Sequence, residues 1–242
     1  MSDLRTDLRR RWRRSARYRP RTATGWIAVI TVAAYVVQLL TDGALQLALQ
    51  YGAAYSLPST GVPFEPWRML TSALIHQPIS IPGSLTGLLH IVFNMVALVS
   101  FGRPLENVIG SARLVVIYVL GALGGSIGVL YASFFGLIPT FTAVYGASGA
   151  VFAVLGAVAV VQRRLGVDVR MLVVLIAINL GLGFVVPGIA WQAHVGGLVV
   201  GAATGWLLVA NRGPRRDRRA RLGVGVITAV LLALALAPAA VV

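Results

Sequence analysis

Four polar side chains lie inside otherwise apolar stretches of this sequence: His90, Asn94, Ser148 and His194. A serine hydroxyl becomes a nucleophile when an imidazole takes its proton, and the oxyanion formed by its attack needs N–H donors. Ser148 and His194 fit the roles of nucleophile and base. No Asp or Glu lies deep in an apolar stretch to complete a triad. The residue types therefore predict a Ser–His dyad, with Asn94 Nδ2, a His90 N–H and the Ser148 backbone N–H as oxyanion donors.

Each of these residues also has a purely structural interpretation. A serine within a helix usually bonds back to a carbonyl and allows close packing, and a lone histidine can form an ordinary interhelical hydrogen bond. The same holds for Asn179, which lies in a further apolar stretch. His90 and Asn94 carry more information, because residues at i and i+4 share one helix face. Both interpretations require knowing where the apolar stretches lie.

The composition indicates a membrane protein. Of the 242 residues 57% are apolar, and the absence of cysteine excludes disulfides and thiol catalysis. A helix that spans a membrane needs about 20 mostly apolar residues. An all-α polytopic fold is therefore expected, with seven spans at 26–42, 85–102, 112–131, 144–161, 170–187, 189–209 and 222–241.

The fifth and sixth spans are separated only by a turn around Pro187 and Gly188. A continuous helix over 170–209 would be about 60 Å long, roughly twice the hydrocarbon thickness of a bilayer. Two helices are therefore expected here.

Arginine sets the orientation. The net charge is +14, and all 21 basic residues are arginines. With the N-terminus in the cytoplasm, all but Arg68 fall in the predicted inner segments, as the positive-inside rule requires. The C-terminus would then lie outside a multi-pass protein of the cell membrane. Because the arginines lie in loops between membrane spans, they are explained by orientation in the membrane, and no nucleic-acid partner is expected. The inner segments are 1–25, 103–113, 162–170 and 211–221.

The basic tail, residues 1–25, has two interpretations that the sequence leaves open. It either lies against anionic lipid or serves as a disordered orientation signal.

This topology places the four polar residues at a common depth. The second, fourth and sixth spans enter from outside near residues 85, 144 and 189. Ser148 and His194 are then about one helical turn in, and His90 and Asn94 two to three turns in. Scattered structural groups have no reason to share the outer half of the bilayer, so a common function is favoured.

The long outer segment, 43–84, contains five prolines, Trp67 and Arg68 among several apolar residues. A disordered linker would be more polar. We expect a compact loop that rests partly in the membrane interface, where Trp67 can also act as an ordinary anchor.

Five motifs together resemble the rhomboid intramembrane serine proteases, and they occur in the family order. They are the outer-loop Trp-Arg signature, the His-x-x-x-Asn helix, the Gly-x-x-x-Glu-x-x-x-Gly turn, the Gly-x-Ser-Gly nucleophile helix and the base-bearing helix. In this sequence they read EPWRMLTSALIHQ (65–77), LLHIVFNMVAL (88–98), FGRPLENVIG (101–110), YGASGAVFAVLG (145–156) and AHVGGLVVG (193–201).

The resemblance implies that Ser148 is the nucleophile and His194 the base. His90 and Asn94, with backbone N–H groups of Ala147 and Ser148, would form the oxyanion hole. Phe152 stands where some relatives carry a tyrosine that stacks near the base. The remaining motif residues would be structural: Gly146 and Gly149 for close backbone approach, Gly197 and Gly201 for packing the sixth span on the fourth, Trp67, Arg68, Glu106 and Gly110 as fold determinants, and His76 as a loop-packing residue.

The resemblance also implies the domain plan and the activity. Residues 26–209 would form a six-helix catalytic core that includes the outer loop 43–84, and 210–242 a basic loop with a seventh helix. The protein would cleave transmembrane segments of single-spanning proteins near the outer face, within the lipid bilayer, without metal or cofactor. The loop at 184–191 would be a mobile cap. The oligomeric state is left open.

Two other functions compete with this one. A catalytically silent rhomboid-like protein that binds membrane helices would keep the fold but usually lose the serine or the histidine. A small-solute transporter would show an inverted repeat and an intramembrane acid. Neither of the transporter features is seen in the sequence.

Overall fold

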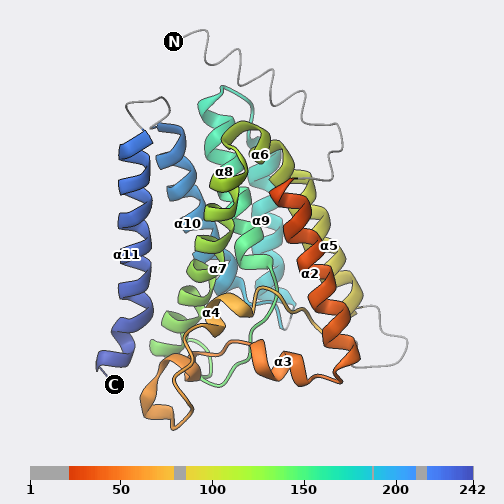
Figure 1. Cartoon of the computed structure of the whole chain (residues 1–242), viewed down its shortest axis with the longest axis vertical. Coiled ribbons are helices and arrows are strands. Elements are labelled where there is room, and N and C mark those ends of the chain that lie inside the picture. The colour runs from red at the N-terminus through yellow and green to blue at the C-terminus, as the bar shows by residue number, and fades with distance from the viewer. Residues whose placement is uncertain (1–21, 79–85, 187, 211–216, 242) are drawn as a thin grey trace.

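The computed structural model describes residues 22–78, 86–186, 188–210 and 217–241. Helices joined by loops make up this part of the chain (Figure 1). Its β pairing is limited to an isolated antiparallel bridge between Tyr51 and Val144. The expected all-α fold is confirmed. Outside the described residues lie most of the basic tail, Pro187, and residues 211–216 of the basic loop that precedes the seventh helix.

The long helices run along one common direction, with α3 and α4 at one end of the bundle and α6 at the other (Figure 1). The long helices are α2 (Ala23–Leu40), α5 (Thr86–Ala97), α7 (Ser111–Phe134), α8 (Ser148–Arg164), α9 (Arg170–Val185), α10 (Trp191–Ala210) and α11 (Asp217–Val241). The shorter elements are α3 (Ala44–Leu49), η1 (Ala53–Ser56), η2 (Pro58–Thr60), α4 (Arg68–Thr71), the π-helical turn η3 (Leu98–Gly102) and α6 (Arg103–Ile109).

Five helices among the described residues are long and apolar enough to cross a membrane, and they coincide with the first, second, third, sixth and seventh predicted spans. α8 and α9 have 17 and 16 residues and are shorter. α8 is buried along most of its length, so other helices rather than lipid surround it. A multi-pass membrane protein is confirmed, and the six-plus-one count stays a prediction.

The boundaries differ from expectation chiefly at two places and agree at the turn between the fifth and sixth spans. The fourth span was expected to begin near residue 144, but α8 begins at Ser148, so Ser148 is the first residue of its helix rather than one turn inside it. The second span continues through η3 into α6, so residues 103–109 are helical rather than part of an inner loop. Pro104 suits the first turn of a helix, and the helix ends at Gly110, whose φ of 90° favours glycine. α9 ends at Val185 and α10 begins at Trp191, which confirms the predicted division.

Glu106 joins three helices at the arginine-rich end of the bundle. Its carboxylate accepts the N–H groups of Ala23 (2.7 Å) and Thr24 (3.0 Å) at the start of α2. It also accepts the hydroxyls of Thr24 and Ser111, each at 2.6 Å. A carboxylate at a helix N-terminus satisfies unpaired N–H groups and opposes the positive end of the helix dipole. This one residue therefore fixes where α2 begins relative to α6 and α7.

Small residues bring α10 into backbone contact with α8. A Cβ on Gly197 would lie 2.0 Å from the carbonyl oxygen of Gly149, and a Cβ on Gly201 would lie 2.0 Å from that of Ala153. No side chain larger than hydrogen fits at either place without movement of the helices. Close approach of this kind is how helices associate in lipid, where apolar burial alone gives little driving force.

The described part of the outer segment, residues 43–78, contributes buried side chains as a compact loop would. Met69 and Ile75 are buried, and Ser126 of α7 donates to the Met69 carbonyl at 2.8 Å. Arg68 forms an ion pair with Glu65, and its guanidinium lies 4.2 Å from the centre of the Tyr55 ring. It also donates to the Leu47 carbonyl at 2.7 Å. Trp67, in contrast, is 55% exposed, which is compatible with an interfacial anchor.

The seventh helix, α11, packs against α7 and α10. At one end Arg113 of α7 pairs with Asp217 at 2.8 Å. Toward the other end Leu231 and Ala235 are buried in the apolar cluster that contains Tyr51 of the outer segment. α11 is thus part of the bundle and contacts the loop that covers its outer end.

Candidate active site

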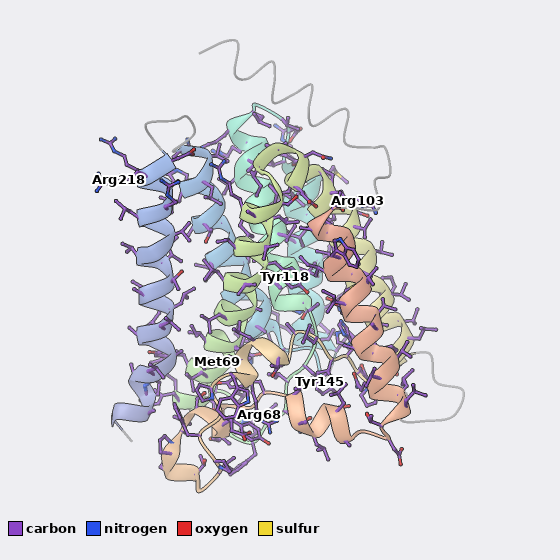
Figure 2. All side chains as sticks on the ribbon, in the orientation of Figure 1. Arg68, Met69, Arg103, Tyr118, Tyr145 and Arg218 are labelled. Atoms are coloured by element: carbon purple, nitrogen blue, oxygen red, sulfur yellow. The ribbon has the colours of Figure 1, made fainter. Side chains whose placement is uncertain are left out.

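Ser148 is the first residue of α8 and is half-buried. The turn before it depends on Gly146, whose φ of 119° favours glycine. The first N–H groups of a helix have no partner within the helix. The backbone N–H of Ser148 therefore has no acceptor within α8. Tyr145, three residues earlier, lies toward the end of the bundle that carries Arg68 and Met69 (Figure 2).

His194 lies over the same face of α8 that carries Ser148. Its ring stacks on Phe152 with ring centres 4.2 Å apart and an angle of 7° between the planes. Phe152 follows Ser148 by four residues, so both point from one face of α8. On the other side of the contact, Gly149 packs against the carbonyl of Ala193. The two elements therefore hold the imidazole close to the N-terminal turn of α8.

One ring nitrogen of His194 makes no hydrogen bond to the described residues. The side chain is 8% exposed, and its Nδ1 atom is buried without a partner in the described part of the chain. Among the described residues no hydrogen bond joins His194 to the Ser148 hydroxyl. Contacts between a nucleophile and its base are often long in the free enzyme and tighten when substrate binds.

His90 on α5 faces the nucleophile turn from the opposite side. A Cβ on Gly146 would lie 2.9 Å from His90 Cε1 and 3.1 Å from Nε2, so only glycine leaves room for the ring. His90 Nδ1 accepts the N–H of Gln77 at 3.2 Å. In a neutral imidazole the other nitrogen then carries the proton. His90 therefore presents an Nε2–H donor toward the turn that precedes Ser148.

Asn94 is one turn further along α5 and is buried. Its Nδ2 donates to the carbonyl oxygen of His90 at 2.9 Å. An amide nitrogen has two hydrogens, so one remains for another acceptor. The fifth polar residue, Asn179 of α9, donates to Leu175 within its own helix and makes no hydrogen bond to this group in the described part of the chain.

One backbone donor that the sequence assigned to the oxyanion hole is already engaged. The Ala147 N–H donates to His76 Nε2 at 3.4 Å. His76 is fully buried in the outer segment, with its ring centre 5.1 Å from that of His90. Sequence reasoning gave His76 only a loop-packing role. The sequence shows His76 only as one of three histidines and does not indicate which residues it contacts in the fold.

The surroundings of His76 lower the pKa of its imidazole. Burial, and secondarily the charge of the nearby His90, lower the pKa of His76 to about 3. His76 is therefore neutral at physiological pH. A neutral ring with Nε2 as the acceptor carries its proton on Nδ1.

Comparison with known proteins shows the family to which the chain belongs. Residues 63–211 match the family model of the Rhomboid domain, which is more than half of the chain. The chain therefore belongs to the rhomboid family.

Several relatives are named as proteases. Rhomboid protease GluP of Bacillus subtilis is 38% identical over 146 residues, which are 57% of this chain and 25% of GluP. RHOMBOID-like protein 4 of Arabidopsis thaliana is 33% identical over 152 residues, 60% of this chain and 34% of that protein. Rhomboid protease AarA of Providencia stuartii is 27% identical over 239 residues, 86% of this chain and 79% of AarA. The chain thus spans about a quarter and a third of the first two relatives.

Proposed function

We propose that this protein is an intramembrane serine endopeptidase that uses Ser148 as nucleophile and His194 as general base. The observation that carries the proposal is the stacking of His194 on Phe152, one turn from Ser148 on the same face of α8. The stacked imidazole, whose Nδ1 has no partner among the described residues, therefore lies on the face of α8 that also carries Ser148. An unpaired buried nitrogen is a cost in a purely structural residue and a requirement in a base.

The chemistry would proceed as acyl transfer. His194 takes the proton of the Ser148 hydroxyl, and the oxygen attacks the scissile carbonyl carbon. The tetrahedral oxyanion accepts hydrogen bonds from His90 Nε2–H, the second Asn94 Nδ2 hydrogen and the Ser148 backbone N–H. The C–N bond then breaks as His194 gives its proton to the leaving amine. In the second half of the reaction His194 takes a proton from water, the water oxygen attacks the acyl carbonyl, and the Ser148 oxygen leaves and recovers its proton from His194. Among the described residues no acid contacts His194, so stacking on Phe152 would orient its ring.

The orientation of the bundle suggests where cleavage occurs. Arg103 and Arg218 lie at one end and Arg68 and Tyr145 at the other (Figure 2). The positive-inside rule assigns the arginine-rich end to the cytoplasm. The catalytic residues would then lie near the outer face of the cell membrane. The substrates would be single-spanning proteins whose transmembrane helix unwinds locally to expose a carbonyl, and the loop around 184–191 would cover the site.

A fluorophosphonate probe tests the proposal, because it reacts covalently with activated serines. We expect wild-type protein in detergent or liposomes to be labelled and Ser148→Ala not to be labelled. His194→Ala should abolish both labelling and cleavage of a reconstituted transmembrane reporter. Labelling that survives Ser148→Ala would remove Ser148 from the mechanism. A folded wild type that neither reacts with the probe nor cleaves any reporter would favour the silent, helix-binding alternative.

A further inference from the structure

A short stretch of the outer segment, residues 72–77, contacts both the turn that precedes Ser148 and the ring of His90. The Ser72 carbonyl accepts the Gly146 N–H at 2.9 Å, and His76 Nε2 accepts the Ala147 N–H at 3.4 Å. These two bonds hold the turn that leads into Ser148. At the other end of the stretch, the Gln77 N–H donates to His90 Nδ1 at 3.2 Å. One segment therefore holds the nucleophile turn and also orients the oxyanion donor.

His76 is the most constrained residue of this stretch. Gln38 of α2 pairs with its backbone in both directions: Gln38 Nε2 donates to the His76 carbonyl at 2.6 Å, and Gln38 Oε1 accepts the His76 N–H at 3.0 Å. The imidazole is 0% exposed and lies between the rings of Tyr35, edge-on at 6.3 Å, and His90. With the backbone and the ring both fixed, Nε2 is a rigid acceptor.

The choice of histidine at this buried position needs a reason. With Nε2 as acceptor, Nδ1 carries the proton. Nδ1 is buried and makes no hydrogen bond of good geometry among the described residues, although the Leu74 backbone lies near enough to oppose in part the lowering of the His76 pKa by burial. A buried donor without a well-aligned acceptor is unfavourable. An apolar side chain would avoid that cost and fill the same space. What the imidazole supplies, and an apolar side chain would not, is an acceptor for the Ala147 N–H, which would otherwise be left unpaired itself.

We propose that His76 is a positioning residue for the nucleophile. By accepting the Ala147 N–H it fixes the turn from Gly146 to Ser148, and so the direction of the Ser148 hydroxyl and N–H. The oxyanion hole then consists of His90, Asn94 and the Ser148 N–H, without Ala147. The inference rests on the proposed role of Ser148. It assigns to the outer segment a part in setting the rate of the chemical step.

Two similar substitutions separate positioning from packing. The side chain of Gln places an amide oxygen near the position of histidine Nε2, whereas the shorter Asn reaches only the position of Nδ1. Both are polar and neutral. We expect His76→Gln to keep kcat within about threefold of wild type. His76→Asn should lower kcat roughly 10- to 100-fold with KM nearly unchanged, because small misplacement of reacting groups has effects of that size. The rate of fluorophosphonate labelling should fall in parallel.

The outcomes are distinct. If His76→Asn remains folded and reacts at the wild-type rate, or if Gln and Asn impair kcat equally, His76 is a packing residue and the inference is wrong. A wild type that the probe does not label would instead contradict the proposed function. Thermal unfolding of each variant shows whether a loss of rate merely reflects a loss of folded protein.

A measurement on the wild type decides the matter even if the Asn variant does not fold. In protein labelled with ¹⁵N-histidine, NMR distinguishes the two neutral tautomers. We expect the proton on Nδ1 in His76 and on Nε2 in His90. A proton on Nε2 of His76 could not coexist with acceptance of the Ala147 N–H, and finding it there would overturn the inference.

Discussion

Asn94 divides its two amide hydrogens between structure and site. One is donated to the His90 carbonyl within α5, and the proposed mechanism uses the other as one of three oxyanion donors. Removing one such donor typically costs about 3 kcal/mol of transition-state stabilisation. We therefore expect Asn94→Ala to lower kcat by roughly 100-fold while Ser148→Ala abolishes turnover, as measured with a reconstituted reporter. An Asn94→Ala protein as inactive as Ser148→Ala would indicate collapse of the site instead.

His76 should make the stability of the protein depend on pH. The pKa of His76 is lowered to about 3 in the folded protein, whereas an unfolded chain titrates this group near its ordinary value of 6.5. Between these values the unfolded state binds a proton that the folded state does not. Stability contributed by the neutral ring is thus present above about pH 6.5 and lost as the pH falls toward 3.

The measurement is the melting temperature against pH for wild type and His76→Gln in the same detergent. Tyr35, Gln38 and His90 face the ring and are common to both proteins. The difference between the two curves therefore isolates His76. We expect the wild type to lose more stability than the variant as the pH drops below about 6.5. Parallel curves over that range would contradict the assignment of a neutral, buried His76.

Among the elements, the contact of α10 with α8 decides whether base and nucleophile meet. A Cβ on Gly201 would lie 2.0 Å from the Ala153 carbonyl, while a Cβ on Gly225 in α11 would meet nothing within 4 Å. Gly201→Ala and Gly225→Ala are therefore matched substitutions in helices. We expect Gly201→Ala to lower stability by about 1–3 kcal/mol, typical of overpacking, and to slow cleavage. Gly225→Ala should leave both unchanged. Equal effects on melting temperature and turnover would show that the helix contact does not set the site.

For the whole molecule, the distribution of charge predicts its orientation. The arginines of the described residues, apart from Arg68, lie in the segments assigned to one side of the membrane. The N-terminus should be cytoplasmic and the end of α11 outside. Fusions of alkaline phosphatase, which is active outside, and green fluorescent protein, which fluoresces inside, to the C-terminus measure this. Phosphatase activity without fluorescence is expected. The reverse would move the catalytic end to the cytoplasmic face and require different substrates.

The sequence alone determined the features that depend on local residue types. The length and apolarity of the helices, the division between α9 and α10, and the membrane class follow from stretches of neighbouring residues, because lipid demands continuous apolar helices. The same holds for the choice of proposed reactive groups, since an acid-free set of Ser, His and Asn allows few chemistries. Even the end of α6 at Gly110 was marked by a glycine, although its helical residues 103–109 were expected as loop.

Only the tertiary structure decided which groups are bonded to which. His76 and Ala147 are 71 residues apart, and nothing in the spacing of either motif relates them. Three features depend in the same way on segments that are distant in sequence and meet in the fold. They are the stacking of His194 on Phe152, the position of Asn94 beside the proposed site, and the contacts of residues 72–77 with His90 and with the turn before Ser148. The physical reason is that hydrogen-bond partners are set by ångström-scale packing, whereas periodicity fixes only the face on which a residue lies.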